Sequence, residues 1–163
     1  MGITQQNSTN DIFWMQQAYN LALQAQTQQE VPVGAVLISK DNILLGSGYN
    51  QMIKISDPCA HAEILALRQA ANSLHNYRLV NTTLYVTLEP CIMCAGAMIS
   101  ARIQRLVFAT PAFKTGAVGS VCNVLHDYIW NHKIQIDTGI MQEDCANLLS
   151  GFFYNQRYHA KNF

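Results

Sequence analysis

Two cysteines three residues apart, Cys91 and Cys94 in the stretch LEPCIMCAGAMI, raise the first chemical question in this sequence. This spacing serves redox dithiols, structural staples and metal sites alike. Pro90 suits the entry to a helix, where its missing N–H costs nothing. Free N–H groups and the helix dipole favour a thiolate at such a position. Redox and metal sites share these advantages, so the pair alone leaves the choice open.

His61 and Glu63 supply the partners that the cysteine pair lacks. Both stand in the first turn of a predicted helix, and crossover topology brings helix starts to the same end of a sheet. One imidazole and two thiolates are the ligands of a catalytic zinc site that keeps its fourth position for water. Glu63 points away from such an ion, because residues two apart on a helix diverge, yet it is near enough to move protons. The plainer alternatives are a capping His61 and a helix-stabilising Glu63, and the combination favours zinc chemistry.

Hydrophobic periodicity predicts the elements that position these residues. Helical spacing indicates helices over 11–26, 61–74, 91–102 and 142–158. Apolar runs bounded by turn residues indicate strands over 31–39, 43–49, 82–88, 105–110 and 133–137. The strand, helix and strand over 82–110 imply a parallel crossover. We therefore expect one α/β domain over 1–163 with a mixed sheet of about five strands, and a flexible N-terminus over 1–9.

Composition narrows the classes of function. The 163 residues are half apolar and carry ten basic and ten acidic side chains, so a polyanionic partner must be met by a local patch. The sequence has neither an apolar run of roughly 18 to 20 residues nor the basic and hydrophobic regions of a signal peptide, so we expect no membrane association. Five cysteines make an odd count, which argues against a disulfide framework and favours a cytoplasmic protein.

The pattern formed by HAE at 61–63 and PCIMC at 90–94 resembles the H-x-E…P-C-x-x-C pattern of zinc deaminases that act on nucleobases. The stretches VPVGAVL, DPCAHAEILALRQA, KTGAVGS and CANLLSGFF extend the resemblance over nearly the whole chain. They are similar to the bacterial tRNA-specific adenosine deaminases, which make inosine at the anticodon wobble position. The resemblance implies a three-layer α/β/α fold of the cytidine deaminase type, one Zn²⁺ per subunit, the anticodon stem-loop of an arginine tRNA as partner, and a homodimer.

Carried over residue by residue, the resemblance implies that His61, Cys91 and Cys94 bind zinc and that Glu63 is the proton shuttle. It also implies six substrate contacts, at Val31, Asn50, Ala62, Leu88, Lys114 and Phe153. Asn50 can equally be a turn residue, the apolar positions can be core, and Phe153 can serve helix packing. Lysine and arginine side chains would meet the phosphates of the RNA, and the candidates are Lys54, Lys114, Arg157 and Lys161.

The chain departs from this family at 111–113, where Pro, Ala and Phe replace a polar pair, so contacts to the flanking nucleotides are open. The small residues of 95–97 allow close packing, either on the chain's own sheet or against a partner subunit. We assign Cys59, Cys122 and Cys145 to core or loop filling.

Three other functions compete with tRNA deamination. A deaminase of free guanine, cytidine or adenosine would use the same zinc site. A zinc-dependent RNA-binding or scaffold protein would not need Glu63, and a thioredoxin-like redox protein would leave both His61 and Glu63 without a role.

Overall fold

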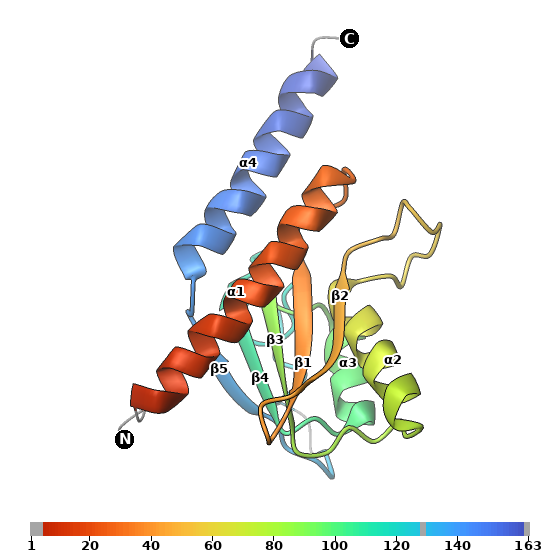
Figure 1. Ribbon diagram of the computed structural model, residues 1–163. Coiled ribbons are helices and arrows are strands. Elements are labelled where there is room, and N and C mark those ends of the chain that lie inside the picture. The colour runs from red at the N-terminus through yellow and green to blue at the C-terminus, as the bar shows by residue number, and fades with distance from the viewer. Residues whose placement is uncertain (1–4, 128–129, 162–163) are drawn as a thin grey trace.

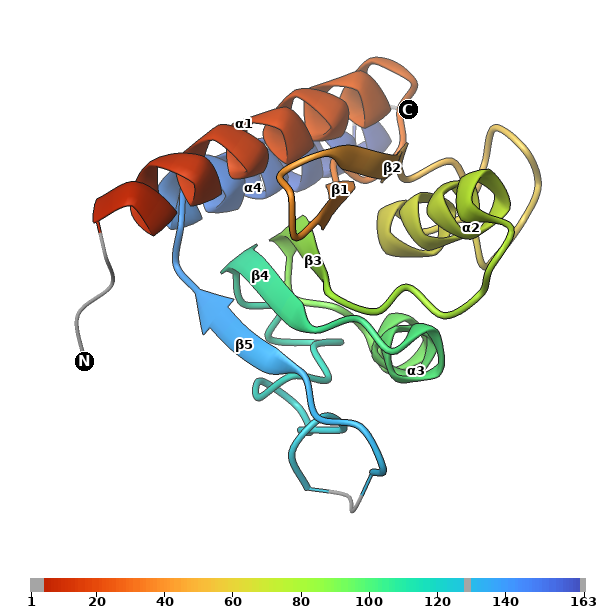
Figure 2. The same cartoon turned by 60° about the horizontal axis from the view of Figure 1, so that its bottom comes forward.

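The computed structural model describes residues 5–127 and 130–161 and consists of a five-stranded sheet with helices on both faces (Figures 1 and 2). The sheet order is β2-β1-β3-β4-β5. The strands are β1 (Gly34–Ser39), β2 (Leu44–Tyr49), β3 (Thr82–Leu88), β4 (Arg105–Thr110) and β5 (Gln135–Thr138). The helices are α1 (Gln5–Thr27), α2 (Ala62–Leu74), α3 (Ile92–Ala101) and α4 (Gln142–Lys161). The expected mixed sheet and three-layer architecture are confirmed.

Two helices cover each face of the sheet. α1 and α4 lie on one face, and α2 and α3 lie on the other (Figure 2). Apolar alternation along the central strands serves both layers: Leu37 and Val86 face the α2 and α3 side, whereas Val36 and Tyr85 face the α1 side. Of the described helices, none is long and apolar enough to cross a bilayer.

Strand direction explains why α2 and α3 both begin near the carboxyl ends of β2 and β3. β2 and β3 both pair with β1 in antiparallel register, so they run in the same direction. β3 and β4 pair in parallel, and α3 is the crossover helix between them. β2 ends at Tyr49 and β3 ends at Leu88, at the same end of the sheet, and the chain after each strand leads to the start of a helix. Segments thirty residues apart in sequence therefore meet there.

Close packing of α2 on the sheet depends on Gly48 in β2. A Cβ atom at this position would lie 2.5 Å from the backbone oxygen of Ala62, the first residue of α2. Only a residue without a side chain allows the helix this approach. Gly48 thereby allows the start of α2 to pack directly on β2.

An ion-pair network fastens α1 to the opposite end of the sheet. The Arg105 guanidinium donates two hydrogen bonds of 2.8 Å to the buried Asp11 carboxylate, and the Tyr85 hydroxyl donates a third of 2.6 Å. Arg105 also donates to Asp137 at 2.6 Å. Burial raises the pKa of Asp11, but the bonds from Arg105 and Tyr85 outweigh it and hold that pKa below its usual value. The network joins α1, β3, β4 and β5.

Several predicted boundaries differ from the observed ones. α1 begins at Gln5 rather than at residue 11, so it includes part of the predicted flexible segment 1–9, of which residues 1–4 lie outside the described ones. β1 begins three residues later than predicted, at Gly34, and β5 is shifted to Gln135–Thr138. His61 and Cys91 are N-cap residues with extended backbones, and not members of the first helical turn, because an N-cap residue keeps non-helical dihedral angles.

All five cysteines are free, and the three that lie away from the start of α3 occupy different environments. Cys145 lies in the first turn of α4 and is buried in the core on the α1 face, as predicted for core filling. Cys59 is half-buried in the loop before α2, and Cys122 is exposed in the loop after β4.

Candidate metal centre and substrate cavity

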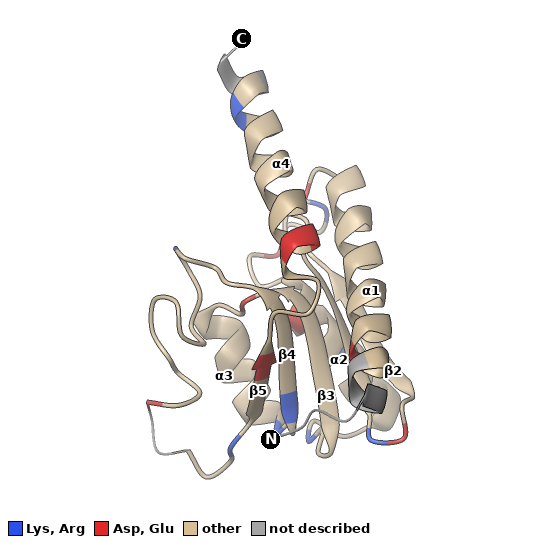
Figure 3. Cartoon of the chain, turned by 90° about the vertical axis from the view of Figure 1, so that its left-hand side faces the viewer, with Lys and Arg blue, Asp and Glu red and all other residues tan. Residues whose placement is uncertain are grey.

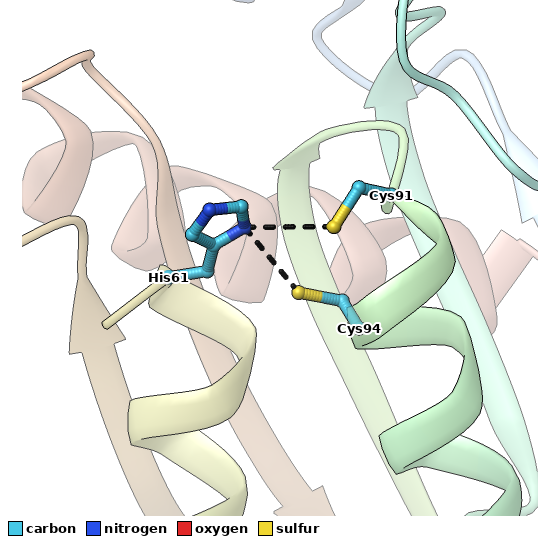
Figure 4. Close-up of side chains that lie close together, drawn as sticks. All are labelled: His61, Cys91 and Cys94. Atoms are coloured by element: carbon cyan, nitrogen blue, oxygen red, sulfur yellow. Dashed lines mark hydrogen bonds between the residues drawn. The ribbon is translucent and has the colours of Figure 1, made fainter. Parts of the chain in front are cut away.

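His61 and the two cysteines converge from the starts of α2 and α3 (Figure 4). His61 precedes α2, Cys91 precedes α3, and Cys94 lies in the first turn of α3. Nδ1 of His61 lies 3.6 Å from each Sγ atom. All three ligand-type atoms lie within 4.8 Å of one another. The structure thus assembles the nitrogen and the two sulfurs that the sequence predicted as one group.

The spacing of these atoms fits zinc. Zinc bonds to nitrogen and sulfur measure about 2.0 to 2.3 Å, so the ligand atoms of a tetrahedral site lie roughly 3.5 to 3.8 Å apart. The two N···S distances of 3.6 Å agree with that spacing. Three protein ligands leave a tetrahedral ion one open position, which is the arrangement of catalytic rather than structural zinc.

The electrostatics of the cysteine pair favour a thiolate at Cys91. A hydrogen bond from the Cys94 thiol, assisted by His61 and opposed by burial, lowers the pKa of Cys91 to about 4. The same contact raises the pKa of Cys94, which holds the shared proton, and contact with Cys91 raises the pKa of His61. A cation that binds here displaces the remaining protons, as metal binding to thiols requires.

Glu63 lies in the first turn of α2 and is buried, with 4% of its surface exposed. Burial raises the pKa of its carboxyl to about 7. A carboxyl with a pKa near neutrality gives up and takes back a proton at similar cost, which suits general acid and base chemistry. Glu63 lies outside the group of three ligand-type residues but lines the same cavity as His61 and Cys91.

A cavity of about 600 Å³ opens beside the metal-ligand group. Its lining includes His61, Glu63 and Cys91, so the chemistry faces the cavity directly. Five of the six predicted substrate contacts also line it, namely Val31, Asn50, Leu88, Lys114 and Phe153. Their role in binding remains a prediction, but the structure brings them to one place.

Ala62 is the predicted contact that does not line the cavity. Its side chain is fully buried against the sheet, because the first turn of α2 packs closely on β2. Its backbone N–H instead donates a 2.9 Å hydrogen bond to Oδ1 of the buried Asn50. This bond fixes the amide of Asn50, so the Nδ2 amino group is the remaining hydrogen-bonding group of a side chain that lines the cavity.

The predicted phosphate contacts are more dispersed. Lys114 and Arg157 line a second hollow of about 700 Å³, which shares Ser150 and Phe153 with the first. Lys54 instead lies against the ring of Tyr49, 5.8 Å from its centroid. Lys161 is the last residue of α4, and its side chain lies outside the described residues. Figure 3 shows basic and acidic residues distributed over several elements, as the balanced charge predicts.

Glu89 is a functional candidate that the sequence analysis missed. It directly follows β3, lines the cavity and is 3% exposed. Its carboxylate accepts hydrogen bonds from the backbone N–H groups of Ala112, Val118 and Ser120 at 2.9 to 3.0 Å, and from the Ser120 hydroxyl. Burial raises the pKa of Glu89, but these four donors outweigh it and lower that pKa. The side chain anchors the loop that forms one wall of the cavity.

Gly116 makes this anchorage possible. A Cβ atom at Gly116 would lie 2.3 to 2.5 Å from the carboxylate atoms of Glu89. The loop is also tied to the start of α3, since the Ala117 N–H donates to the Pro90 oxygen at 2.8 Å. The KTG sequence at 114–116 is a signal that could have found this contact, because a glycine in a loop often marks a close approach to another group.

Hydrolytic deaminases of nucleobases have a catalytic site in which three ligands hold zinc beside a carboxylate that transfers protons. The sequence agrees with that class: residues 8–110 match the family model of the cytidine and deoxycytidylate deaminase zinc-binding region. The chain belongs to this family. Zinc is the cofactor of the family, and the His61, Cys91 and Cys94 group is where a metal ion fits this chain.

Within this family, the chain is similar to deaminases that act on tRNA. The tRNA-specific adenosine deaminase of Haemophilus influenzae is 49% identical over 147 residues, which cover 90% of this chain and 85% of that protein. That of Buchnera aphidicola is 44% identical over 151 residues, which cover 93% and 99%. A solved structure from a study of A-to-I editing by tRNA:A34 deaminases has a TM-score of 0.81 at 36% identity, covering 84% of this chain and 99% of that one.

Proposed function

We propose that this protein hydrolytically deaminates the wobble adenosine of a tRNA anticodon, that of an arginine tRNA, to inosine and ammonia. The observation that carries the proposal is the position of Glu63, buried at the wall of the same cavity as His61 and Cys91. The similarity to tRNA-specific adenosine deaminases over nine-tenths of the chain supports adenosine in tRNA as the substrate.

His61, Cys91 and Cys94 would hold the zinc ion, with one nitrogen and two sulfurs at mutual distances that suit it. When bound, zinc supplies the Lewis acidity that activates a water molecule near neutral pH. Two thiolates and a neutral imidazole balance its charge. Burial of Cys94 keeps this part of the site dry, which strengthens electrostatic interactions there.

Glu63 performs the proton transfers. Its carboxylate takes a proton from the attacking water and delivers it to N1 of adenine, while the oxygen bonds to C6. The second water proton then passes through Glu63 to the exocyclic amine. The C6–N6 bond breaks, ammonia leaves and inosine remains, so one water is consumed for each ammonia released. A pKa of about 7 allows Glu63 to act in both directions near neutral pH.

Asn50 and the apolar wall orient the nucleoside. The Asn50 amide, held by Ala62, is placed to hydrogen-bond the nucleoside, and Val31 and Leu88 provide apolar contact for the base. The Lys114 ammonium and the Arg157 guanidinium suit phosphates of the adjoining RNA, because both line the second hollow next to the cavity.

The homodimer and the cytoplasmic location belong to the same proposal. α3 exposes 65% of Ile92, and a Cβ atom at Gly96 would have no described atom within 4 Å, so both positions are free for a second subunit. Ala95 instead packs within the chain, against Ala117 and Val124. A tRNA substrate places the proposed activity in the cytoplasm.

The test is to incubate the zinc-loaded protein with an arginine tRNA that carries adenosine at the wobble position, and to digest the RNA for nucleoside mass analysis. The same tRNA with guanosine at that position is the control. We expect inosine from the first RNA alone. If inosine is absent while free guanine, cytidine or adenosine is deaminated, the protein is instead a deaminase of free bases or nucleosides.

A further inference from the structure

Phe113 stands on the rim of the cavity with 81% of its surface exposed. Among the residues that the structure describes, no aromatic ring pairs with it. A single exposed apolar residue is ordinary on a protein surface, but this one lines the same cavity as Glu63 and Asn50.

The backbone beneath Phe113 is held in place. Phe113 and Lys114 are the central residues of a turn closed by hydrogen bonds from the Thr115 and Gly116 N–H groups to the Ala112 oxygen, at 3.2 and 2.7 Å. The residue before Phe113 is fixed in turn, because the Ala112 N–H donates to the buried Glu89 carboxylate at 2.9 Å. The turn therefore presents the ring with its backbone already ordered, so a ligand that contacts the ring need not order this segment on binding.

A base in the cavity with its C6 atom near Glu63 brings its neighbouring nucleotides to the rim, since they are bonded to it. Bases released from an RNA loop are usually bound by stacking on aromatic side chains, whereas phosphates are met by lysine and arginine. The rim offers both groups side by side, the Phe113 ring and the Lys114 ammonium. RNA fits this pairing better than a protein segment does, because the ring and the cation adjoin the catalytic cavity itself.

We propose that Phe113 stacks on the base of a nucleotide adjoining the target adenosine and so helps to determine which RNA is accepted. This inference rests on the proposed function and extends it to a residue with no role in the proton transfers. The ring acts in binding, so its loss raises KM and leaves kcat nearly unchanged.

The experiment measures inosine formation in an anticodon stem-loop with Phe113→Ala, Phe113→Leu and Phe113→Trp. Base stacking predicts a KM about 5- to 150-fold higher for Phe113→Ala. Phe113→Leu should resemble Phe113→Ala, because leucine is apolar but cannot stack, and Phe113→Trp should keep the wild-type KM. Tyr77→Ala is the matched control, since Tyr77 is an aromatic residue with 65% exposure beyond the far end of α2. The high exposure of Phe113 predicts unchanged folding and zinc content in every variant.

A second arm removes single bases from the RNA. Stem-loops with an abasic site on the 5′ or the 3′ side of the target adenosine should bind the wild type more weakly than the intact stem-loop does. For the side on which the base stacks, removing that base should weaken binding to Phe113→Ala only slightly, because the stacking contact is already lost. That coupling identifies the stacked base. Independent effects, or an unchanged KM for Phe113→Ala with an active wild type, overturn the inference and leave the proposed function intact. A wild type that forms no inosine overturns both.

Discussion

Removal of the Glu89 carboxylate should loosen the cavity wall that it anchors. In Glu89→Ala, the backbone N–H groups of Ala112, Val118 and Ser120 lose an ionised acceptor. Each unsatisfied buried N–H costs about 1 to 3 kcal/mol. The end of this loop is exposed at Ser120, where water can replace part of the loss. We therefore expect the lower end of the sum, about 3 kcal/mol, which lowers Tm by about 6 to 12 °C in a chain of this size.

The assay is thermal unfolding of the zinc-loaded protein at one fixed zinc concentration, combined with hydrogen exchange over 111–120. Glu89→Ala should show both the lower Tm and faster exchange in this loop. Glu89→Gln should lie between it and the wild type, because an amide has one acceptor oxygen in place of two. The control is Asp127→Ala, since Asp127 is exposed and, among the described residues, its carboxylate contacts the exposed His126. A Tm within about 1 °C of the wild type, with unchanged exchange, would refute the anchoring role.

Two further predictions concern the ion-pair network and the metal. The lowered pKa of Asp11 means that its contribution to stability is complete near neutral pH and is lost as the pH falls through that pKa. The Tm difference between the wild type and Asp11→Asn should therefore be several degrees at pH 7 and should narrow below about pH 4, and a difference that is constant with pH would contradict this. Cys91→Ala should reduce bound zinc from one ion per chain to almost none and abolish activity. The control Cys122→Ala, at an exposed cysteine, should keep both the zinc and the activity. Metal analysis after dialysis measures the bound zinc, and full zinc in Cys91→Ala would show that Cys91 is not a ligand.

Periodicity and spacing predicted most of the fold, because the apolar patterns on β1, β3 and β4 and on α2 agree with their final packing. The boundaries were harder to predict. The backbone at His61 and Cys91 is extended, and sequence spacing does not distinguish an N-cap residue from the first residue of a helix. β5 is a short edge strand with half-exposed residues, so its apolar signal is weak.

The zinc ligands and Glu63 could be predicted as a group because they lie in two short motifs at helix starts. Glu89 could not be predicted in the same way. Its role arises from contacts with a loop more than twenty residues away, and the residues around Glu89 carry no pattern that marks a carboxylate accepting backbone N–H groups. The glycine of KTG indicates only that some group approaches this loop closely. The position of Phe113 depends on the same contacts, so its exposure on the rim became visible only in the folded chain.

If Glu63 moves the protons of a zinc-dependent adenosine deamination, its replacement slows the reaction without removing the metal. The most direct measurement compares the wild type and Glu63→Gln, both loaded with zinc, for single-turnover inosine formation in an arginine tRNA. Glu143→Gln, at an exposed carboxylate of α4, is the control. We predict equal zinc content in all three proteins, wild-type rates in the control, and a loss of about 10²- to 10⁴-fold in Glu63→Gln. A Glu63→Gln variant with full zinc and a wild-type rate would show that Glu63 does not move these protons.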